Sequence, residues 1–465
     1  MGKKSWYDLE RRYPSLYSFI SFRRERGGGF VFNPHLYSEK WVDDLGFRVL
    51  ELLDGTHAVS DVIGSVSQAL GLDVQQSRKI VYGCLRDLNG YFALNWRDEP
   101  ITITSPLEGQ ESDVDIIGNG DYYYAPLSVL WDLTYRCNLR CRHCLNEVTA
   151  PVEEMGLSDV EKVLRELRKM RVFSINFSGG EPLLRGDLMK ILSKASELNF
   201  GVRLSTNGLM LDEGLLRELG ELDVYCIQIS LDGIGETHDN FRGSEGAYES
   251  AVDALKLASE LGFYTTMSTM IIRENLHEIG DLLDLAVSIG VSSFKLNTFM
   301  PVGRGSRSRN ELSVSKEELR NLAKEMASRR KNYEGHIDMQ MDALFPWLFE
   351  PKLPPNHVVR GINPPLKLRC SAGHSTLVIS PDGTVYPCPY LTQFPLGNIL
   401  EKPLKEIWND NEGILGKFRS ILQKDLKGKC RDCQHVPTPC NGGCRAAAYI
   451  EKGDFYGEDP FCWKN

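Results

Sequence analysis

Residues 137–144 read Cys-Asn-Leu-Arg-Cys-Arg-His-Cys and place three cysteines, Cys137, Cys141 and Cys144, close together. Thiolates select soft metals and iron–sulfur clusters. A cubane cluster takes four ligands, so three thiolates leave one iron open to bind and activate another molecule. A zinc site and unrelated core cysteines are the alternatives, but zinc sites usually bring their ligands in two close pairs. The triplet therefore predicts an iron–sulfur cluster with an open iron.

The composition of the chain is that of an ordinary globular protein, with 42% hydrophobic and 25% charged residues. Its 465 residues suffice for roughly two to four domains. The net charge of −9 argues against a nucleic-acid partner, because such proteins usually carry a basic surplus. No apolar run is long enough to cross a membrane, and the N-terminus lacks the apolar stretch of a signal peptide. We therefore expect a cytoplasmic protein without a membrane partner.

The chain has twelve cysteines, which in a reducing compartment and at close spacing indicate metal sites rather than disulfides. Ten of them fall in two groups, three at 137–144 and seven at 370–462. Cys84 and Cys226 stand apart in apolar runs, so we expect both to be small buried side chains rather than ligands.

Residues 1–97 are predicted to form a small separate domain. Two strands, 19–24 and 30–32, flank a glycine turn at 27–29, and three helical patterns and a short strand at 91–95 follow. The apolar positions that mark the three helices are Trp41, Leu45, Val49 and Leu52; Val62, Val66 and Leu70; and Val81, Leu85 and Leu88. An acidic linker, 98–126, comes next.

Residues 127–300 alternate between short strand-like segments and helical patterns, which predicts repeated βα units. The expected strands are 128–133, 173–177, 202–205, 225–231, 264–270 and 294–297, with helices such as 160–170 and 188–198 between them. Such units form a parallel sheet or barrel with helices outside, and chemistry occurs at the C-terminal ends of the strands. The cysteine triplet follows the first strand, where that rule places a reactive site.

The remainder of the chain is divided into two regions. Residues 301–369 form a transition segment, rich in arginine early and in proline later, with a helix at about 315–329. Residues 370–465 are rich in cysteine and contain a hairpin at 378–386 on the turn Asp382-Gly383.

The spacing of the triplet, with His143 in the place of an aromatic residue, resembles the radical S-adenosylmethionine (SAM) superfamily. That resemblance implies an α/β fold built on a partial (β/α)6 TIM-like barrel, a 4Fe–4S cluster on the triplet, and SAM bound at the open iron. It also implies an enzyme that reductively cleaves SAM to a 5′-deoxyadenosyl radical, which takes hydrogen from the substrate. An electron donor such as ferredoxin or flavodoxin would supply the electron.

Further motifs occur in the order that the superfamily has. A Gly-Gly-Glu-Pro loop at 179–182 follows the second strand, and polar segments end the third and fourth strands. By resemblance the SAM contacts are His143, Ser178, Gly179, Gly180, Glu181, Ser205, Asn207, Ser230 and Arg242. Taken singly, these segments also read as ordinary turns, and Arg242 as a structural salt bridge. No acid or base for catalysis is defined, although His238, Asp239 and Tyr390 are candidates.

The C-terminal cysteines resemble the SPASM extension of this superfamily, with six residues between Cys433 and Cys440 where the family usually has five. The resemblance implies one or two auxiliary clusters. Their ligands would be Cys370, Cys388 and Cys444 for the first, and Cys430, Cys433, Cys440 and Cys462 for the second. The first set is one ligand short, so we expect an open iron or a non-cysteine ligand there, with His374 and His357 as candidates. A zinc site is the alternative for Cys430, Cys433, Cys440 and Cys444, but it leaves Cys370, Cys388 and Cys462 unexplained.

Residues 1–97 resemble the PqqD-like peptide-recognition fold, a winged-helix-like α+β domain that captures a leader peptide as an added strand. The sequence therefore predicts an enzyme that modifies a ribosomally made peptide or small protein. One alternative is a radical SAM enzyme acting on a small molecule such as a tetrapyrrole. Another is a non-catalytic iron–sulfur electron carrier, and a winged helix with arginines near its hairpin also fits a nucleic-acid binder.

Overall fold

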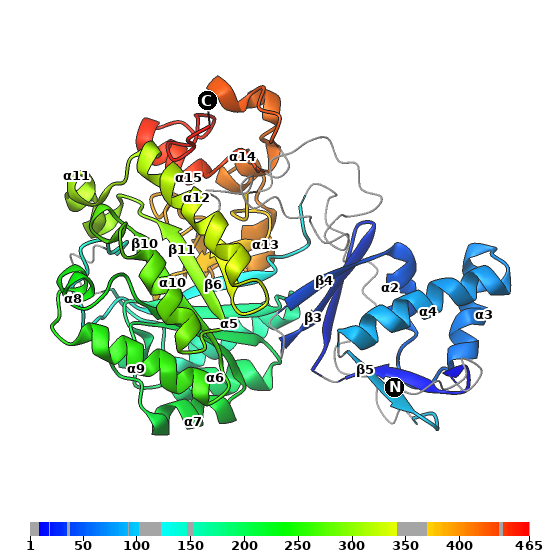
Figure 1. Ribbon diagram of the computed structural model, residues 1–465. Helices are drawn as coiled ribbons and strands as arrows, with labels where there is room; N and C mark the ends of the chain where they lie inside the picture. Colours follow the sequence, from blue (N-terminus) through cyan, green and yellow to red (C-terminus); the bar gives the residue numbers. More distant parts are fainter. Residues whose placement is uncertain are drawn as a thin grey trace. The chain divides into compact units, whose positions relative to one another are not determined.

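The computed structural model describes residues 9–17, 19–34, 38–91, 93–101, 122–146, 152–341, 370–436 and 440–464. The described residues up to Tyr124 form one compact unit, and those from Ala125 onward form a second (Figure 1). The domain boundaries predicted from the sequence stay predictions, and most of the acidic linker lies outside the described residues. Among the described residues, no helix combines the length and the apolar character that a membrane span requires.

In its described residues the first unit combines two small antiparallel sheets with the three helices α2, α3 and α4. One sheet has the order β2-β3-β4, and β1 pairs with β5. The strands are β1 (Tyr13–Leu16), β2 (Ser21–Glu25), β3 (Gly28–Asn33), β4 (Ser38–Asp43) and β5 (Leu94–Arg97), and the helices are α2 (Asp44–Glu51), α3 (Val59–Leu70) and α4 (Val74–Gly90). The predicted combination of small strands and helices is present, and the likeness of this unit to a winged helix stays a prediction.

The first predicted helix begins later than the sequence pattern suggested. Trp41 was expected on its apolar face but lies in β4, opposite Phe30, with the two ring centroids 5.0 Å apart. Asp43 ends the strand and caps α2, since its carboxylate accepts from the amide of Gly46 at 2.9 Å. The predicted face is therefore wrong, and Leu45 is exposed. The apolar residues of α3 and α4, by contrast, face the core of the unit as predicted.

The second unit is built on one sheet of ten strands in the order β12-β11-β10-β9-β8-β7-β6-β13-β14-β15. Strands β6 to β11 run parallel, which confirms the predicted βα units. They are β6 (Ser128–Thr134), β7 (Ser174–Gly179), β8 (Gly201–Thr206), β9 (Val224–Ser230), β10 (Tyr264–Ile271) and β11 (Ser293–Thr298). The main intervening helices are α5 (Leu157–Lys169), α6 (Leu188–Glu197), α7 (Glu213–Glu221), α9 (Ala247–Glu260) and α10 (Ile279–Ser288).

Both edges of this sheet are extended by strands from later in the chain. β12 (Asp338–Met341) pairs with β11, and β13 (Thr376–Ile379) pairs in parallel with β6. β13 and β14 (Thr384–Tyr386) form the predicted hairpin on the Asp382-Gly383 turn, and β15 (Gly397–Asn398) follows. The remaining helices are α8 (Glu236–Arg242), α11 (Arg309–Leu312), α12 (Lys316–Asn332), α13 (Leu404–Asn409), α14 (Ile414–Ser420) and α15 (Arg445–Lys452). The sequence did not show that the cysteine-rich region begins on the same sheet.

The two faces of the parallel sheet differ in polarity because side chains alternate along each strand. Fully buried apolar residues occupy one face, for example Trp131 and Phe177, whose rings lie 5.9 Å apart. The opposite face carries partly buried polar residues, namely Asp132, Asn176, Ser178, Ser205, Gln228, Ser230, Ser268 and Asn297. Helices α6, α7, α9 and α10 pack along the sheet (Figure 1). The polar face is the interior of the partial barrel.

Candidate cluster and cofactor site

The cysteine triplet lies on the loop that follows β6, at the C-terminal edge of the parallel sheet. Cys137 is exposed, Cys141 is buried, and Cys144 is half-buried. Segments distant in sequence hold this loop: the amide of Arg142 donates to the carbonyl of Phe241 at 3.1 Å, and the amide of Gly305 donates to the carbonyl of Cys144 at 3.1 Å. The predicted position of the triplet is thus confirmed.

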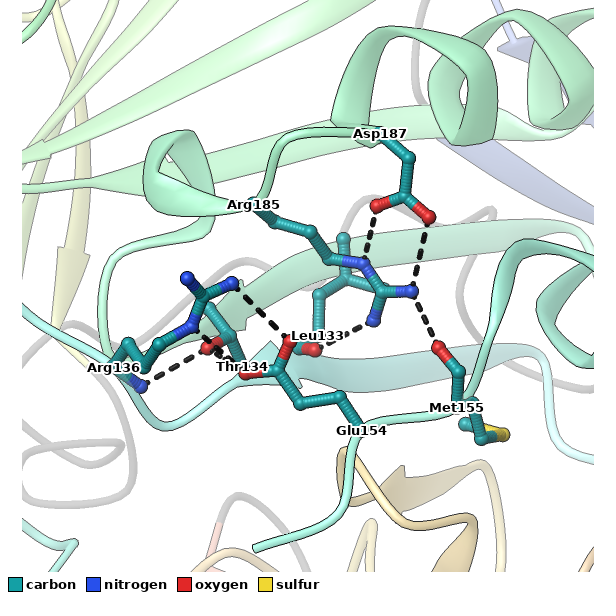
Figure 2. Close-up of polar contacts among 7 residues, drawn as sticks. All are labelled: Leu133, Thr134, Arg136, Glu154, Met155, Arg185 and Asp187. Carbon is teal, nitrogen blue, oxygen red and sulfur yellow. Dashed lines mark hydrogen bonds and ion pairs between the residues drawn. The ribbon is translucent and has the colours of Figure 1, made fainter. Parts of the chain in front are cut away.

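Two arginines fix the start of the loop (Figure 2). The buried guanidinium of Arg185 donates to the carbonyl of Leu133 at 2.8 Å and to the carbonyl of Met155 at 2.6 Å, and it pairs with Asp187. Arg136 pairs with Glu154, with 3.2 Å between Nε and Oε1. The sequence analysis missed these contacts, because no local pattern shows that the side chain of Arg185 lies against the C-terminal end of β6.

The Gly179-Gly180 pair packs directly against the backbone that enters the cysteine loop. The amide of Gly180 donates to the carbonyl of Thr134 at 2.7 Å, and the amide of Glu181 donates to the carbonyl of Arg136 at 2.8 Å. A β-carbon on Gly180 would lie 2.2 Å from the carbonyl oxygen of Arg136, and one on Gly179 would lie 2.1 Å from that of Thr134. Glycine is needed here because the two backbones touch.

The side chain of Glu181 is fully buried and holds the end of β8. Its carboxylate accepts from the hydroxyl of Thr206 at 2.8 Å and from the amide of Asn207 at 2.8 Å, and burial raises its pKa. The side-chain amide of Asn207 donates to that of Asn138, inside the cysteine loop, at 2.7 Å. Glu181 and Asn207 therefore join the ends of three strands, and their contact with SAM stays a prediction. Asn138 was missed by the sequence analysis.

The polar face of the sheet brings the other predicted SAM contacts together. The hydroxyl of Ser205 donates to Asn176 at 2.9 Å and accepts from Gln228 at 3.3 Å. Ser178 and Ser230 make no side-chain hydrogen bond to any residue that the structure describes, so both hydroxyls are available to a ligand. The structure does not test which of them binds SAM.

Asp132 is a candidate site residue that the sequence analysis missed. It lies on the polar face of β6, in register with Ser178, and its carboxyl has no hydrogen-bond or ion-pair partner among the described residues. Burial raises the pKa of Asp132 to about 7. Unpartnered carboxyls with strongly shifted pKa values gather at functional sites. A charged residue in the middle of an apolar strand was the available sequence signal.

Arg242 connects a buried ion pair to the cysteine loop. Its Nε donates to Asp232 at 2.7 Å, and one terminal nitrogen lies 3.5 Å from the sulfur of Cys141. Asp232 also accepts from the amide of Met270 at 2.7 Å. The structural salt bridge is therefore present, and the predicted contact of Arg242 with the SAM carboxylate stays a prediction.

The two histidines near this pair are neutral at physiological pH. His143 stacks on Phe241 with ring centroids 4.5 Å apart, and burial lowers its pKa to about 3. Burial lowers the pKa of His238 to about 4, and its Nδ1 accepts from the amide of Asp232 at 2.9 Å. Asp239 accepts from two backbone amides at the start of α9. His238 and Asp239 thus have structural roles in this arrangement.

The C-terminal cysteines interact electrostatically in two groups, and their assignment as the ligands of two clusters stays a prediction. Electrostatic interactions join Cys388 to both Cys370 and Cys444, and they join Cys462 to cysteines of the second set. Burial raises the pKa of Cys444 to about 12 and that of Cys440 to about 11, so cluster assembly must remove protons that these thiols otherwise keep.

The thiol donors of these groups are of the type that holds iron–sulfur clusters. No three His, Cys, Asp or Glu side chains in the described part of the chain surround one metal-ion position. A cluster spreads its thiolates over several irons, so it needs no such convergence. His374 is buried, with Nδ1 3.4 Å from the carbonyl of Ala372, and remains a candidate ligand, whereas His357 lies outside the described residues.

Of the two isolated cysteines, Cys226 is buried as predicted, whereas Cys84 is half-buried and packs against the core of the first unit. Cys226 is fully buried, with its sulfur 3.7 Å from the hydroxyl of Thr266. Burial raises the pKa of Cys84 to about 12.

A cysteine triplet at the C-terminal edge of a partial parallel barrel, followed by two further thiolate sets, defines an iron–sulfur enzyme of the barrel type. Comparison with known families agrees: residues 131–286 match the model of the radical SAM superfamily, and residues 370–434 match the SPASM iron–sulfur cluster-binding domain. The chain belongs to the radical SAM superfamily and has the SPASM extension. Its cofactors are SAM, a 4Fe–4S cluster in the core and auxiliary clusters.

Relatives by sequence include enzymes of two kinds. An AdoMet-dependent heme synthase of Methanosarcina barkeri is 31% identical over 349 residues, covering 73% of this chain and 96% of the relative. Mycofactocin maturase MftC of Mycolicibacterium smegmatis is also 31% identical, covering 73% of this chain and 83% of the relative. Both comparisons support enzymatic activity.

A solved structure resembles nearly the whole chain. Streptococcus suis SuiB bound to its precursor peptide SuiA has a TM-score of 0.71 and 18% identity, covering 96% of this chain and 98% of SuiB. At this identity the similarity establishes the fold alone.

We expect a Gly180→Ala variant to load several-fold less iron than the wild type. The added carbon would press on the carbonyl of Arg136 and displace the loop, a strain that costs about 1–3 kcal/mol of stability. Iron content and visible absorbance after anaerobic purification measure the effect. Gly186→Ala is the control, because a β-carbon there has nothing within 4 Å. Equal iron loading in both variants would contradict the role of this contact.

We expect Arg242→Gln to lower the free energy of unfolding by about 3–5 kcal/mol, because Asp232 would remain buried and unpaired. Arg217→Gln removes an exposed helical pair with Glu213 and should cost less than about 0.5 kcal/mol. Anaerobic thermal melting of both variants compares the two. Equal decreases in melting temperature in the two variants would show that the buried pair of Arg242 and Asp232 is no more stabilising than the exposed pair of Arg217 and Glu213.

The stability of the chain should fall as the pH drops through the window that His238 defines. Its folded pKa of about 4 lies below the unfolded value of about 6.5, so between them only the unfolded state takes up the proton. This histidine therefore lowers the free energy of unfolding by about 1.4 kcal/mol for each unit by which the pH falls through that window. His238→Gln, which keeps an acceptor, should flatten the dependence of melting temperature on pH. His277→Gln, at an exposed position, should leave it unchanged.

Proposed function

We propose that the enzyme modifies a ribosomally made peptide or small protein. In this proposal the core cluster and SAM supply the radical that removes hydrogen from the substrate, while the first unit captures the peptide. An electron donor such as ferredoxin or flavodoxin supplies the reducing electron. The polar inner face of the sheet, with Ser178 and Ser230 available to ligands, orients SAM and the substrate.

The observation that carries the proposal is the difference in coverage between the comparisons. The heme synthase is matched over 96% of its own length, yet that match covers only 73% of this chain. The resemblance to SuiB, which was solved with a bound precursor peptide, covers 96%. This chain therefore extends beyond the region that it shares with the heme synthase, and SuiB matches nearly the whole chain in fold.

The first unit has the features that peptide capture requires. Within the described residues β2 and β4 each pair only with β3, so each has an outer edge on which an extended peptide can add as a strand. This is the mode of recognition expected for a PqqD-like domain.

The arginines of the hairpin do not favour nucleic acid as the partner. Arg23 is fully buried and pairs with Glu25 at 2.8 Å, and Arg24 pairs with Asp44 at 2.6 Å. Arg12 pairs with Asp98 at 2.9 Å. Charges that are neutralised within the unit contribute little to a basic surface.

A second candidate function is modification of a tetrapyrrole, which the heme-synthase relatives favour. The two functions can be separated with the purified enzyme, SAM and a reductant under anaerobic conditions. Candidate peptides from small reading frames beside the gene are compared with Fe-coproporphyrin III. Mass change of the peptide supports the proposal, and turnover of the porphyrin alone overturns it.

We expect a variant lacking residues 1–124 to lose turnover of the peptide while still releasing 5′-deoxyadenosine from SAM, because the core unit keeps the cysteine triplet. The wild type given a leaderless peptide should behave in the same way. Cys141→Ala should abolish 5′-deoxyadenosine release in every case, which excludes the electron-carrier alternative. Undiminished peptide turnover by the truncated enzyme would show that the first unit does not recognise the substrate.

A further inference from the structure

Arg445 lies between the two C-terminal cysteine sets and is almost completely buried, with an exposed fraction of 1%. It directly follows Cys444 and begins α15. One terminal nitrogen donates to the carbonyls of Phe455 at 3.0 Å and Gly457 at 2.8 Å, and the other donates to the carbonyl of Gly442. The guanidinium thus joins the chain before Cys444 to the segment that leads to Cys462.

The guanidinium forms no ion pair in the described part of the chain, and the one carboxylate that interacts with it electrostatically is that of Asp459. Its Nε is buried without a hydrogen-bond partner among the described residues. A buried unpaired cation is strongly unfavourable, so such cations are normally paired or bound to a ligand. An anionic group that binds beside Arg445 would add the close negative charge that Asp459, which makes no ion pair with it, does not supply.

The thiolates of the two auxiliary clusters have the required charge. Arg445 acts electrostatically on Cys370, in the first set, and on Cys430, in the second. Thiolate-bound clusters are anionic, and each one-electron reduction adds a further negative charge. In a buried site of low dielectric constant a nearby cation stabilises that added charge.

We propose that Arg445 is the shared counter-cation of both auxiliary clusters and raises the reduction potential of each. Its unpartnered Nε–H is available to a cluster sulfur. Because one charge acts on both clusters, it shifts their two reduction potentials in the same direction. The two potentials therefore stay similar enough for an electron to pass from one cluster to the other. The proposal depends on the presence of the clusters and not on the identity of the substrate.

Asp459 gives a charge of opposite sign beside the same cysteines. Its carboxylate is buried and accepts from the amide of Cys444 at 2.6 Å and from the amide of Phe461 at 2.8 Å. Burial raises the pKa of this carboxyl, while the two amide donors and the charge of Arg445 act in the opposite direction and favour the ionised form. Asp459 therefore opposes the effect of Arg445 and offers a second, independent variant.

The test is a redox titration followed by electron paramagnetic resonance in the full-length chain. Cys137, Cys141 and Cys144 are replaced by alanine so that only the auxiliary clusters give signals. Arg445→Gln should lower both potentials by about 59 mV or more, a tenfold change in each one-electron equilibrium. Arg445→Lys keeps the charge but loses the planar fork, so it should retain the potentials while the protein melts at a lower temperature.

Arg431→Gln is the matched control, since Arg431 directly follows Cys430 but is exposed to water. Its loss should leave both potentials unchanged. The proposal is overturned if Arg445→Gln retains its iron and both potentials stay at the wild-type values, or if only one cluster shifts. Should that variant fail to load iron, Asp459→Asn decides: both potentials should rise, and no rise overturns the proposal.

Discussion

The close contact between two backbone segments governs the arrangement of the site. The amides of Gly180 and Glu181 donate to the carbonyls of Thr134 and Arg136, just before the first cysteine. Only glycine allows this approach, since a β-carbon at 180 would overlap a carbonyl oxygen. The contact fixes where the cysteine loop leaves the sheet. It also places the Gly-Gly-Glu-Pro loop beside the triplet, so that one ligand can touch both.

The two faces of the parallel sheet carry side chains of different polarity and have different roles. The apolar residues on one face pack under the helices and stabilise the unit, while the polar residues on the other face line the barrel interior. Asp132 and Gln228 keep polar atoms on that face without described partners. Leaving such groups unsatisfied is unfavourable for folding, which indicates that they serve binding.

The C-terminal region buries thiols and a guanidinium that bound clusters would interact with. Burial raises the pKa of Cys444, and the Nε of Arg445 is buried without a hydrogen-bond partner among the described residues. Folding, cluster assembly and electrostatics are therefore coupled in this region. The hairpin β13–β14 attaches the start of this region to β6, the strand that leads into the triplet.

The sequence by itself determined the ligand chemistry and the core strands, because cysteine spacing and alternating hydrophobicity are local properties. The triplet, the six βα strands and the Asp382-Gly383 hairpin were all predicted from it. The tertiary structure alone decided that β13 joins the sheet at β6, that Trp41 lies in a strand, and that Arg185, Asn138 and Arg445 support the cysteine loops. Those contacts join residues far apart in the chain, or follow from burial and pairing, and no local pattern encodes which distant carbonyl or carboxylate a side chain will meet.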